Sequence, residues 1–187
     1  FLITVTGYGP DLELRSPTLT AAIAGFRRLA ELIGPQRTIW RYDPIILDEG
    51  HDAAWHRTNF ETLADRLAGA SSKCILSFVT PYAKTLRNLP GLAEPRLDAK
   101  RALAAELKDL AQARGMILTA CCASDLDGIL EPAGCVDARL LGVTAQTDRH
   151  QRPACTCASS LDLGCYDSCT HGCRYCYASA SPEQALK

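Results

Sequence analysis

The run Cys74–Val79, with the sequence CILSFV, decides the predicted fold class. It is short, continuously apolar and without helical spacing, which is typical of a strand buried on both faces of a parallel sheet. The segment 97–114 follows with leucines at helical spacing and ends at Gly115, after which residues 116–121 form a second apolar run. Together they predict a strand, a crossover helix and a parallel strand.

The same pattern recurs twice towards the N-terminus. Residues 1–6 predict a strand, followed by a helix that begins at Ser16-Pro17 and ends at Gly34. Residues 38–42 predict another strand, and a helix capped by Asp52 follows it. Such alternation favours parallel pairing with right-handed crossovers, in either an open doubly wound sheet or an arc of a (β/α) barrel.

The expected fold is therefore α/β, a partial (β/α) TIM-like barrel with parallel strands and a Cys-rich C-terminal loop segment. We place the barrel domain in residues 1–146 and the Cys-rich, cluster-binding segment in residues 147–187. The chain opens inside an apolar run without methionine, so we expect the barrel domain to be truncated at its N-terminus.

Composition restricts the classes of partner. The chain has 187 residues, 47% of them hydrophobic, and a formal net charge of −1. That length is enough for one sizeable core, and that charge gives no general attraction to nucleic acid. No apolar run reaches the roughly 20 residues that span a bilayer, and no signal peptide is recognisable. We expect a cytoplasmic protein without nucleic acid or membrane partners.

Ten cysteines are the unusual feature of the composition. Six crowd the C-terminal segment: Cys155, Cys157, Cys165, Cys169, Cys173 and Cys176. Because the chain has ample core and no export signal, metal or redox chemistry is favoured over a disulfide framework.

The spacing Cys169-x3-Cys173-x2-Cys176 lets one loop present three thiolates to one [4Fe–4S] cluster and leaves one iron open. Gly172 would allow close approach of the backbone. Zinc is the alternative, because the six cysteines and His171 also suffice for a tetrahedral site. Zinc ribbons more often present two separated Cys-x2-Cys pairs, and this segment has one.

This loop, with Tyr175 before its last cysteine, resembles the cluster loop of radical S-adenosylmethionine enzymes. Its position near the end of the chain, together with the sequence WRYDPI at residues 40–45, resembles the bacterial family called domain of unknown function 1848. The resemblance covers nearly the whole chain and implies a C-terminal cysteine cluster with no assigned reaction. Cys155, Cys157 and Cys165 also fit the family pattern, and they could supply a fourth ligand, hold a second cluster or brace the loop.

The resemblance implies an iron–sulfur protein, with a radical S-adenosylmethionine-like reaction of unknown substrate as the leading hypothesis. Its cofactors would be the [4Fe–4S] cluster and S-adenosylmethionine, and its partners a small-molecule substrate and a reductant protein. No Gly-Gly-Glu-like segment follows a strand, which weakens the support for methionine binding. The alternatives are a non-enzymatic binding module stabilised by zinc or a cluster, and electron transfer alone.

Residues at the predicted strand ends are further candidates. Arg41 and Asp43 could bind the carboxylate and amine of a cofactor, or brace each other at the rim. Cys121 and Cys122 also end a strand, but free cysteines are commonly small buried residues, and this is the interpretation we favour for them. The pair His51 and His56 is expected to face solvent.

Overall fold

A computed structural model describes residues 1–149, 151–152, 154–161 and 163–179. Five strands form one parallel sheet in the order β1-β2-β3-β4-β5, the order of the chain. The strands are β1 (Leu2–Thr4), β2 (Ile39–Ile45), β3 (Lys73–Phe78), β4 (Ile117–Ala120) and β5 (Glu131–Pro132). The predicted α/β class with parallel strands is confirmed.

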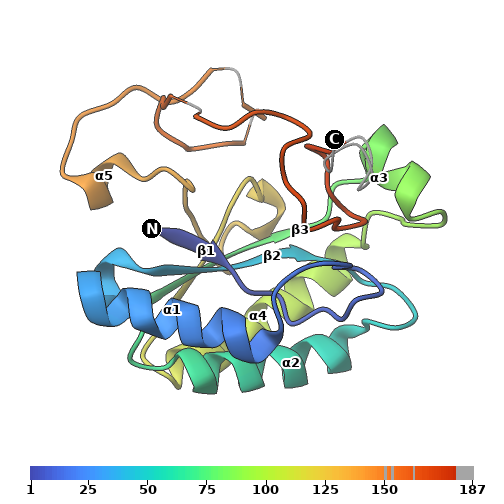
Figure 1. Ribbon diagram of the computed structural model, residues 1–187, viewed down its shortest axis with the longest axis horizontal. Coiled ribbons are helices and arrows are strands. Elements are labelled where there is room, and N and C mark those ends of the chain that lie inside the picture. The colour runs from blue at the N-terminus through green and yellow to red at the C-terminus, as the bar shows by residue number, and fades with distance from the viewer. Residues whose placement is uncertain (150, 153, 162, 180–187) are drawn as a thin grey trace.

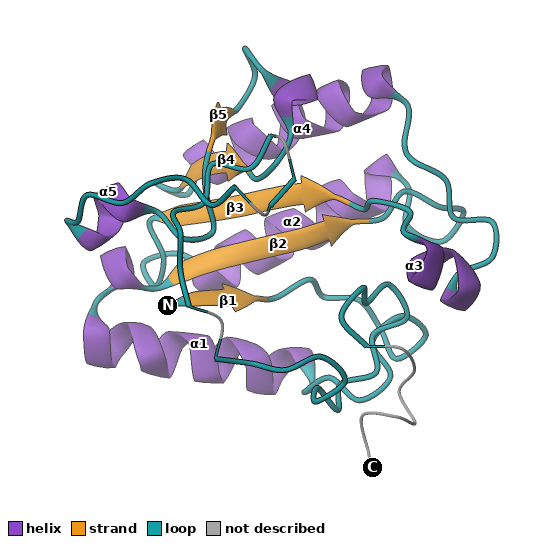
Figure 2. Cartoon of the chain, turned by 90° about the horizontal axis from the view of Figure 1, so that it is seen from above, coloured by secondary structure: helices purple, strands orange, loops and turns teal. Residues whose placement is uncertain are grey.

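The long helices share one face of the sheet, and the C-terminal segment passes over the other (Figure 1). The helices are α1 (Leu19–Ile33), α2 (Ala53–Leu67), α3 (Ala83–Asn88), α4 (Leu97–Gln112) and α5 (Ala138–Leu141), with single-turn helices η1 (Pro35–Arg37) and η2 (Ser124–Leu126). Figure 2 shows the loops of the C-terminal segment lying across the sheet on the side away from α1, α2 and α4.

The sheet is open. Within the described residues β1 and β5 each pair with a single neighbouring strand, so no closed TIM barrel is formed. Among the described strands the order does not reverse, unlike that of a doubly wound sheet. The structure therefore does not show the expected TIM-like barrel. It shows an open parallel α/β sheet with its long helices on one side.

The helix ends follow local capping chemistry. The side chain of Asp52 accepts a hydrogen bond from the Trp55 amide at 2.8 Å, as the sequence predicted. In α1 the cap is Thr18, which accepts from the Ala21 amide, so the predicted start at Ser16 is two residues too early. Both residue types can cap a helix, so the sequence alone does not distinguish them.

The helix-facing side of the strands is closed and apolar. Trp40, Tyr42, Cys74 and Leu76 point towards the helices and are at most 2% exposed. The Trp40 ring stacks on Phe60 of α2, with 4.7 Å between ring centroids. This layer joins the sheet to its helices by burial of apolar surface.

Successive side chains of each strand alternate between the two faces, and the face away from the helices carries polar side chains. Arg41 and Asp43 on β2 and Ser77 on β3 lie there, beside a small apolar cluster that includes Ile39, Ile75, Cys121 and Ala133. In the part of the chain that the structure describes, no helix is long and apolar enough to cross a membrane.

Candidate metal centres and the cavity beside the sheet

Strand β2 places Arg41 and Asp43 on the sheet face away from the helices. Their side chains form an ion pair with 2.6 Å between Nη2 and Oδ2, and they are 31% and 11% exposed. The hydroxyl of Ser77 on β3 donates a hydrogen bond to the second carboxylate oxygen of Asp43. Nε of Arg41 is buried without a hydrogen-bond partner among the described residues.

Charges on this face are partly desolvated. Burial raises the pKa of Asp43, against the opposing effect of the Arg41 and Arg152 guanidinium groups. Burial also lowers the pKa of Arg41, but the carboxylate of Asp43 and the nearby thiols outweigh this, and the net shift is upward. The pair therefore combines a fixed cation with a carboxyl group that protonates more readily than usual.

A cavity of about 730 Å³ lies against this face. Its floor includes Arg41, Asp43 and Ser77 from the sheet. Its walls include Cys173 and Cys176 from the C-terminal segment. Side chains that are far apart in the sequence thus line one space of a size typical of small-molecule sites.

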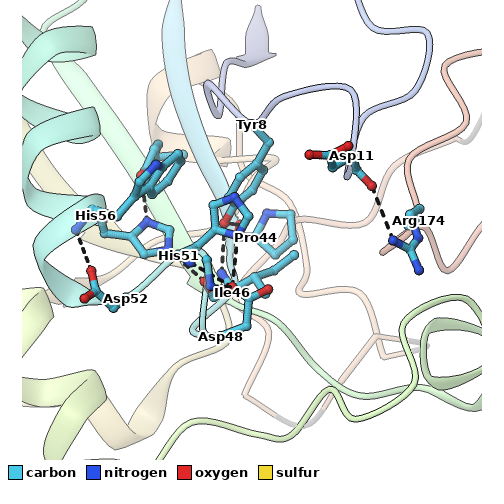
Figure 3. A network of polar contacts seen from close by, with 12 residues as sticks. Tyr8, Asp11, Pro44, Ile46, Asp48, His51, Asp52, His56 and Arg174 are labelled. Atoms are coloured by element: carbon cyan, nitrogen blue, oxygen red, sulfur yellow. Dashed lines mark hydrogen bonds and ion pairs between the residues drawn. The ribbon is translucent and has the colours of Figure 1, made fainter.

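Main-chain hydrogen bonds attach the loop around Cys173 to the segment between β1 and α1. The Arg15 amide donates to the carbonyl of His171 at 2.8 Å, and the Arg174 amide donates to the carbonyl of Leu12 at 2.9 Å. The Arg174 guanidinium also donates to the carbonyl of Asp11 (Figure 3). The cysteine loop is therefore fixed on the edge of the sheet beside the cavity.

Side-chain contacts strengthen this attachment. The hydroxyl of Tyr175 donates to Glu13, which also accepts a hydrogen bond from Thr6.

The cysteines of this loop differ in their surroundings. Burial, followed by the negative charge of Glu13, raises the pKa of Cys173. Gly172 adopts a positive φ of 70°, a conformation that side chains other than glycine rarely take. Cys169 itself is exposed.

A buried network supports the chain after β2 (Figure 3). His56 is 0% exposed, so the expectation that it faces solvent was wrong. Its Nε2 lies 2.8 Å from the carbonyl oxygen of Ile46, which can only accept, so Nδ1 must accept from the hydroxyl of Tyr42. The hydroxyl of Tyr8 donates to the carbonyl of Pro44 and accepts from the Ile46 amide. These bonds hold the end of β2 and hence Asp43.

Three cysteines gather where the C-terminal segment meets the loops that follow β4 and β5. The Sγ atoms of Cys121, Cys135 and Cys157 all lie within 4.8 Å of one another, and the group could bind a metal ion. The sulfurs of Cys121 and Cys135 are 3.6 Å apart. Among the described residues no other set of three or more potential ligands meets that limit, so Cys169, Cys173 and Cys176 are spread more widely.

The thiols of this group differ in acidity. The hydrogen bond between the thiols of Cys135 and Cys121 lowers the pKa of Cys135 to about 6, with help from the positive charge of Arg41. The same hydrogen bond, followed by burial, raises the pKa of Cys121.

The structure divides the sequence-predicted cysteines between two places. Cys173 and Cys176 line the cavity, while Cys165 and Cys169 are exposed. Cys157 belongs to the second group, and Cys155 lies beside it, accepting a hydrogen bond from the Cys157 amide. Residues 180–187 of the predicted cluster-binding segment lie outside the described residues.

Sequence reasoning noted that Cys121 lies at the carboxyl end of a strand, where the loops of parallel sheets gather functional groups, but favoured a small buried residue over a ligand. It did not propose Cys135 as a ligand. Cys135 follows β5, a two-residue strand too short to recognise from hydrophobic pattern.

Comparison with known proteins identifies a family but no individual relative. The family model described as "Domain of unknown function (DUF1848)" matches residues 1–178. No curated protein and no solved structure matches the chain.

Proposed function

Since the chain belongs to the DUF1848 family, whose reaction is unassigned, we propose its function from the site: an iron–sulfur protein with radical S-adenosylmethionine-like activity on a small molecule. In this proposal Cys169, Cys173 and Cys176 hold a [4Fe–4S] cluster. The observation that carries it is the shared cavity, which has Cys173 and Cys176 in its wall and Arg41 and Asp43 in its floor.

The donor set of the loop fits such a cluster better than a single ion. All three candidate ligands are thiols, the donors that iron–sulfur clusters use. Their sulfurs do not all lie within 4.8 Å of one another, whereas those of Cys121, Cys135 and Cys157 do. A cubane attaches each cysteine to a different iron, so its ligands need not approach one another as the ligands of one metal ion do.

A cluster with three cysteine ligands supplies an electron at an iron that is open to a chelating molecule such as S-adenosylmethionine. The cavity residues would orient that molecule and the substrate. Arg41 offers guanidinium N–H groups from the floor of the cavity to a carboxylate. Asp43 offers its carboxylate to an amine, and the Ser77 hydroxyl holds it in place.

The electron would come from a reductant protein. Cys169 is exposed, so the cluster edge beside it would be within reach of a docked partner. The small-molecule substrate would enter the cavity between the sheet and the loop that carries Cys176 and Tyr177.

A non-enzymatic module is the second candidate. In it the metal only fastens the C-terminal segment to the sheet, and the cavity binds a ligand without transforming it. The compact group of Cys121, Cys135 and Cys157 favours this candidate, because it lies between strand ends and the C-terminal segment.

The test is anaerobic reconstitution with iron and sulfide, followed by electron paramagnetic resonance of the reduced protein with and without S-adenosylmethionine. We expect a cluster signal that S-adenosylmethionine alters. The triple variant Cys169→Ala, Cys173→Ala, Cys176→Ala should lose the signal, while Cys74→Ala, a buried cysteine on the helix-facing side, should keep it. An unaltered signal would leave electron transfer or a structural role, and a protein that binds no iron would refute the proposal.

A further inference from the structure

We propose that Cys121, Cys135, Cys155 and Cys157 form a closed zinc site, separate from the cluster loop, that fastens the C-terminal segment to the sheet. This site does not depend on the proposed enzymatic function. It draws on the end of β4, the loop after β5 and the segment that precedes the cluster loop.

The sulfur positions agree with one shared ion. With Zn–S bonds of about 2.3 Å and tetrahedral angles, two thiolates on one zinc lie about 3.8 Å apart. The sulfurs of Cys121 and Cys135 are 3.6 Å apart, and Cys157 completes a triangle within 4.8 Å. An ion can therefore be placed among the three with small adjustments of side-chain rotamers.

Cys155 is the fourth ligand in this arrangement. It is 9% exposed, and its Sγ accepts a hydrogen bond from the Cys157 amide at 3.4 Å. The Cys135 amide donates to Sγ of Cys157 at 3.0 Å. Amide N–H groups that point at sulfur favour the thiolate form, which is the form that binds metal.

Cys122 is the competing fourth ligand, since its sulfur lies 3.9 Å from that of Cys121. Cys155 is preferred because it enters the group from the same segment as Cys157, next to it in space and two positions before it in the chain. A Cys-x-Cys pair then supplies two ligands from one turn of chain.

The surroundings compensate the charge of the site. Four thiolates on Zn²⁺ leave a net charge of −2, and four protons go to solvent as the ion binds. The guanidinium of Arg41 interacts electrostatically with Cys121 and Cys135, and that of Arg152 with Cys121 and Cys122. Arg152 and Arg41, the second of which is paired with Asp43, thus place positive charge near the sulfurs in a partly buried setting.

The backbone is shaped for close approach at this point. A Cβ added at Gly134 would lie 2.9 Å from Cα of Cys157 and from the carbonyl oxygen of Thr156, both main-chain atoms. The Ala158 amide donates to the carbonyl of Val136 at 2.9 Å on the same pair of segments. Glycine at position 134 therefore lets Cys135 and Cys157 meet.

A site with four cysteine ligands has no open position, which is typical of structural zinc. Its role here would be to hold residues 154–158 over the sheet, and with them the chain that leads to the loop of Cys169. The ion would add to the main-chain bond between Ala158 and Val136, which joins the same segment to the chain after β5.

The experiment measures zinc and iron per chain by mass spectrometry after anaerobic purification of the whole chain. The triple variant Cys169→Ala, Cys173→Ala, Cys176→Ala should keep one zinc while losing its iron. In that background Cys135→Ser and Cys155→Ser should each lower zinc at least about tenfold, whereas Cys122→Ser and the exposed Cys165→Ser should leave it unchanged. These measurements also distinguish the two proposals, because the zinc content tests this site, whereas the iron content and the paramagnetic resonance signal test the cluster.

Replacement by cobalt(II) provides a second measurement if the serine variants do not fold. Cobalt bound to the triple variant should give the strong visible absorption of a tetrahedral thiolate site, and zinc should displace it. Absence of zinc from the triple variant, iron in its place, or zinc retained in Cys135→Ser would overturn the proposal. Loss of zinc in Cys122→Ser but not in Cys155→Ser would overturn the ligand set.

Discussion

The two faces of the sheet differ although the same strands build both. On the helix-facing side Trp40 and Phe60 are fully buried and stack on each other. On the other side Arg41 and Asp43 come from the same strand, yet they form a charged pair at the floor of a cavity. Because successive side chains of a strand point to opposite faces, one strand can serve stability and ligand binding at once.

The difference between the faces predicts which property a substitution on each face should alter. Substitutions on the helix-facing side should alter the free energy of unfolding and leave the metal content of folded molecules unchanged. Substitutions on the cavity side should alter binding of metal or ligand and change the stability of the metal-free chain less. The four predictions below test this division, beginning with the largest expected effect.

Phe60→Ala should destabilise the protein by about 3–5 kcal/mol, since it removes a fully buried ring that packs on Trp40 and Tyr42. Urea denaturation measures the effect. Exposed Leu32 on α1 is a matched control, and Leu32→Ala should cost less than about 1 kcal/mol. A cost below about 1 kcal/mol for Phe60→Ala would contradict the division between the faces.

His56 should make the free energy of unfolding depend on pH. Burial lowers its pKa from 6.5 to about 4. The unfolded chain therefore takes up a proton first, so this stability is fully present above pH 6.5 and is lost as the pH falls towards 4. The full effect is about 3 kcal/mol.

Urea denaturation at pH 7 and at pH 5 measures about 2 kcal/mol of this effect, since pH 5 lies about 1.5 units below the unfolded pKa. His56→Gln removes the titrating ring, and its stability should change less than that of the unaltered chain between these values. Equal pH dependence in the two proteins would show that His56 is not the cause.

Arg41→Gln should weaken binding of S-adenosylmethionine to the reconstituted protein by about 1.5–3 kcal/mol, the range for a hydrogen bond to a charged group. Calorimetry measures the affinity. Arg28, exposed on α1, is the control, and Arg28→Gln should bind as the unaltered chain does. Unchanged affinity in Arg41→Gln would make the pair with Asp43 a brace of the sheet rather than a ligand site.

Thr18→Ala should cost about 1 kcal/mol, since Thr18 caps α1 through the Ala21 amide. Ser16→Ala should change the stability of the metal-free chain by less than about 0.5 kcal/mol, because Ser16 lies outside the helix. Thermal or urea unfolding of the two variants compares them directly. A larger cost at Ser16 would restore the helix start expected from the sequence.

Much of the fold could be predicted because it depends on local pattern. The apolar run at 74–79, the helical spacing after Leu97 and the cap at Asp52 each specify an element without reference to distant residues. The strand β5 and the short helix α5 could not be recognised, since two and four residues carry too little periodicity. The open edge of the sheet also has no local sequence pattern.

The sequence by itself determined the parallel α/β class, the family resemblance and the Cys-x3-Cys-x2-Cys loop with its candidate chemistry. These depend on residue order and spacing. Only the tertiary structure brought Cys121 and Cys135 to Cys157, buried His56 and placed Arg41 and Asp43 in one cavity with Cys173. The reason is physical: strand pairing and the return of the C-terminal segment create contacts between residues whose separation along the chain carries no information about distance in space.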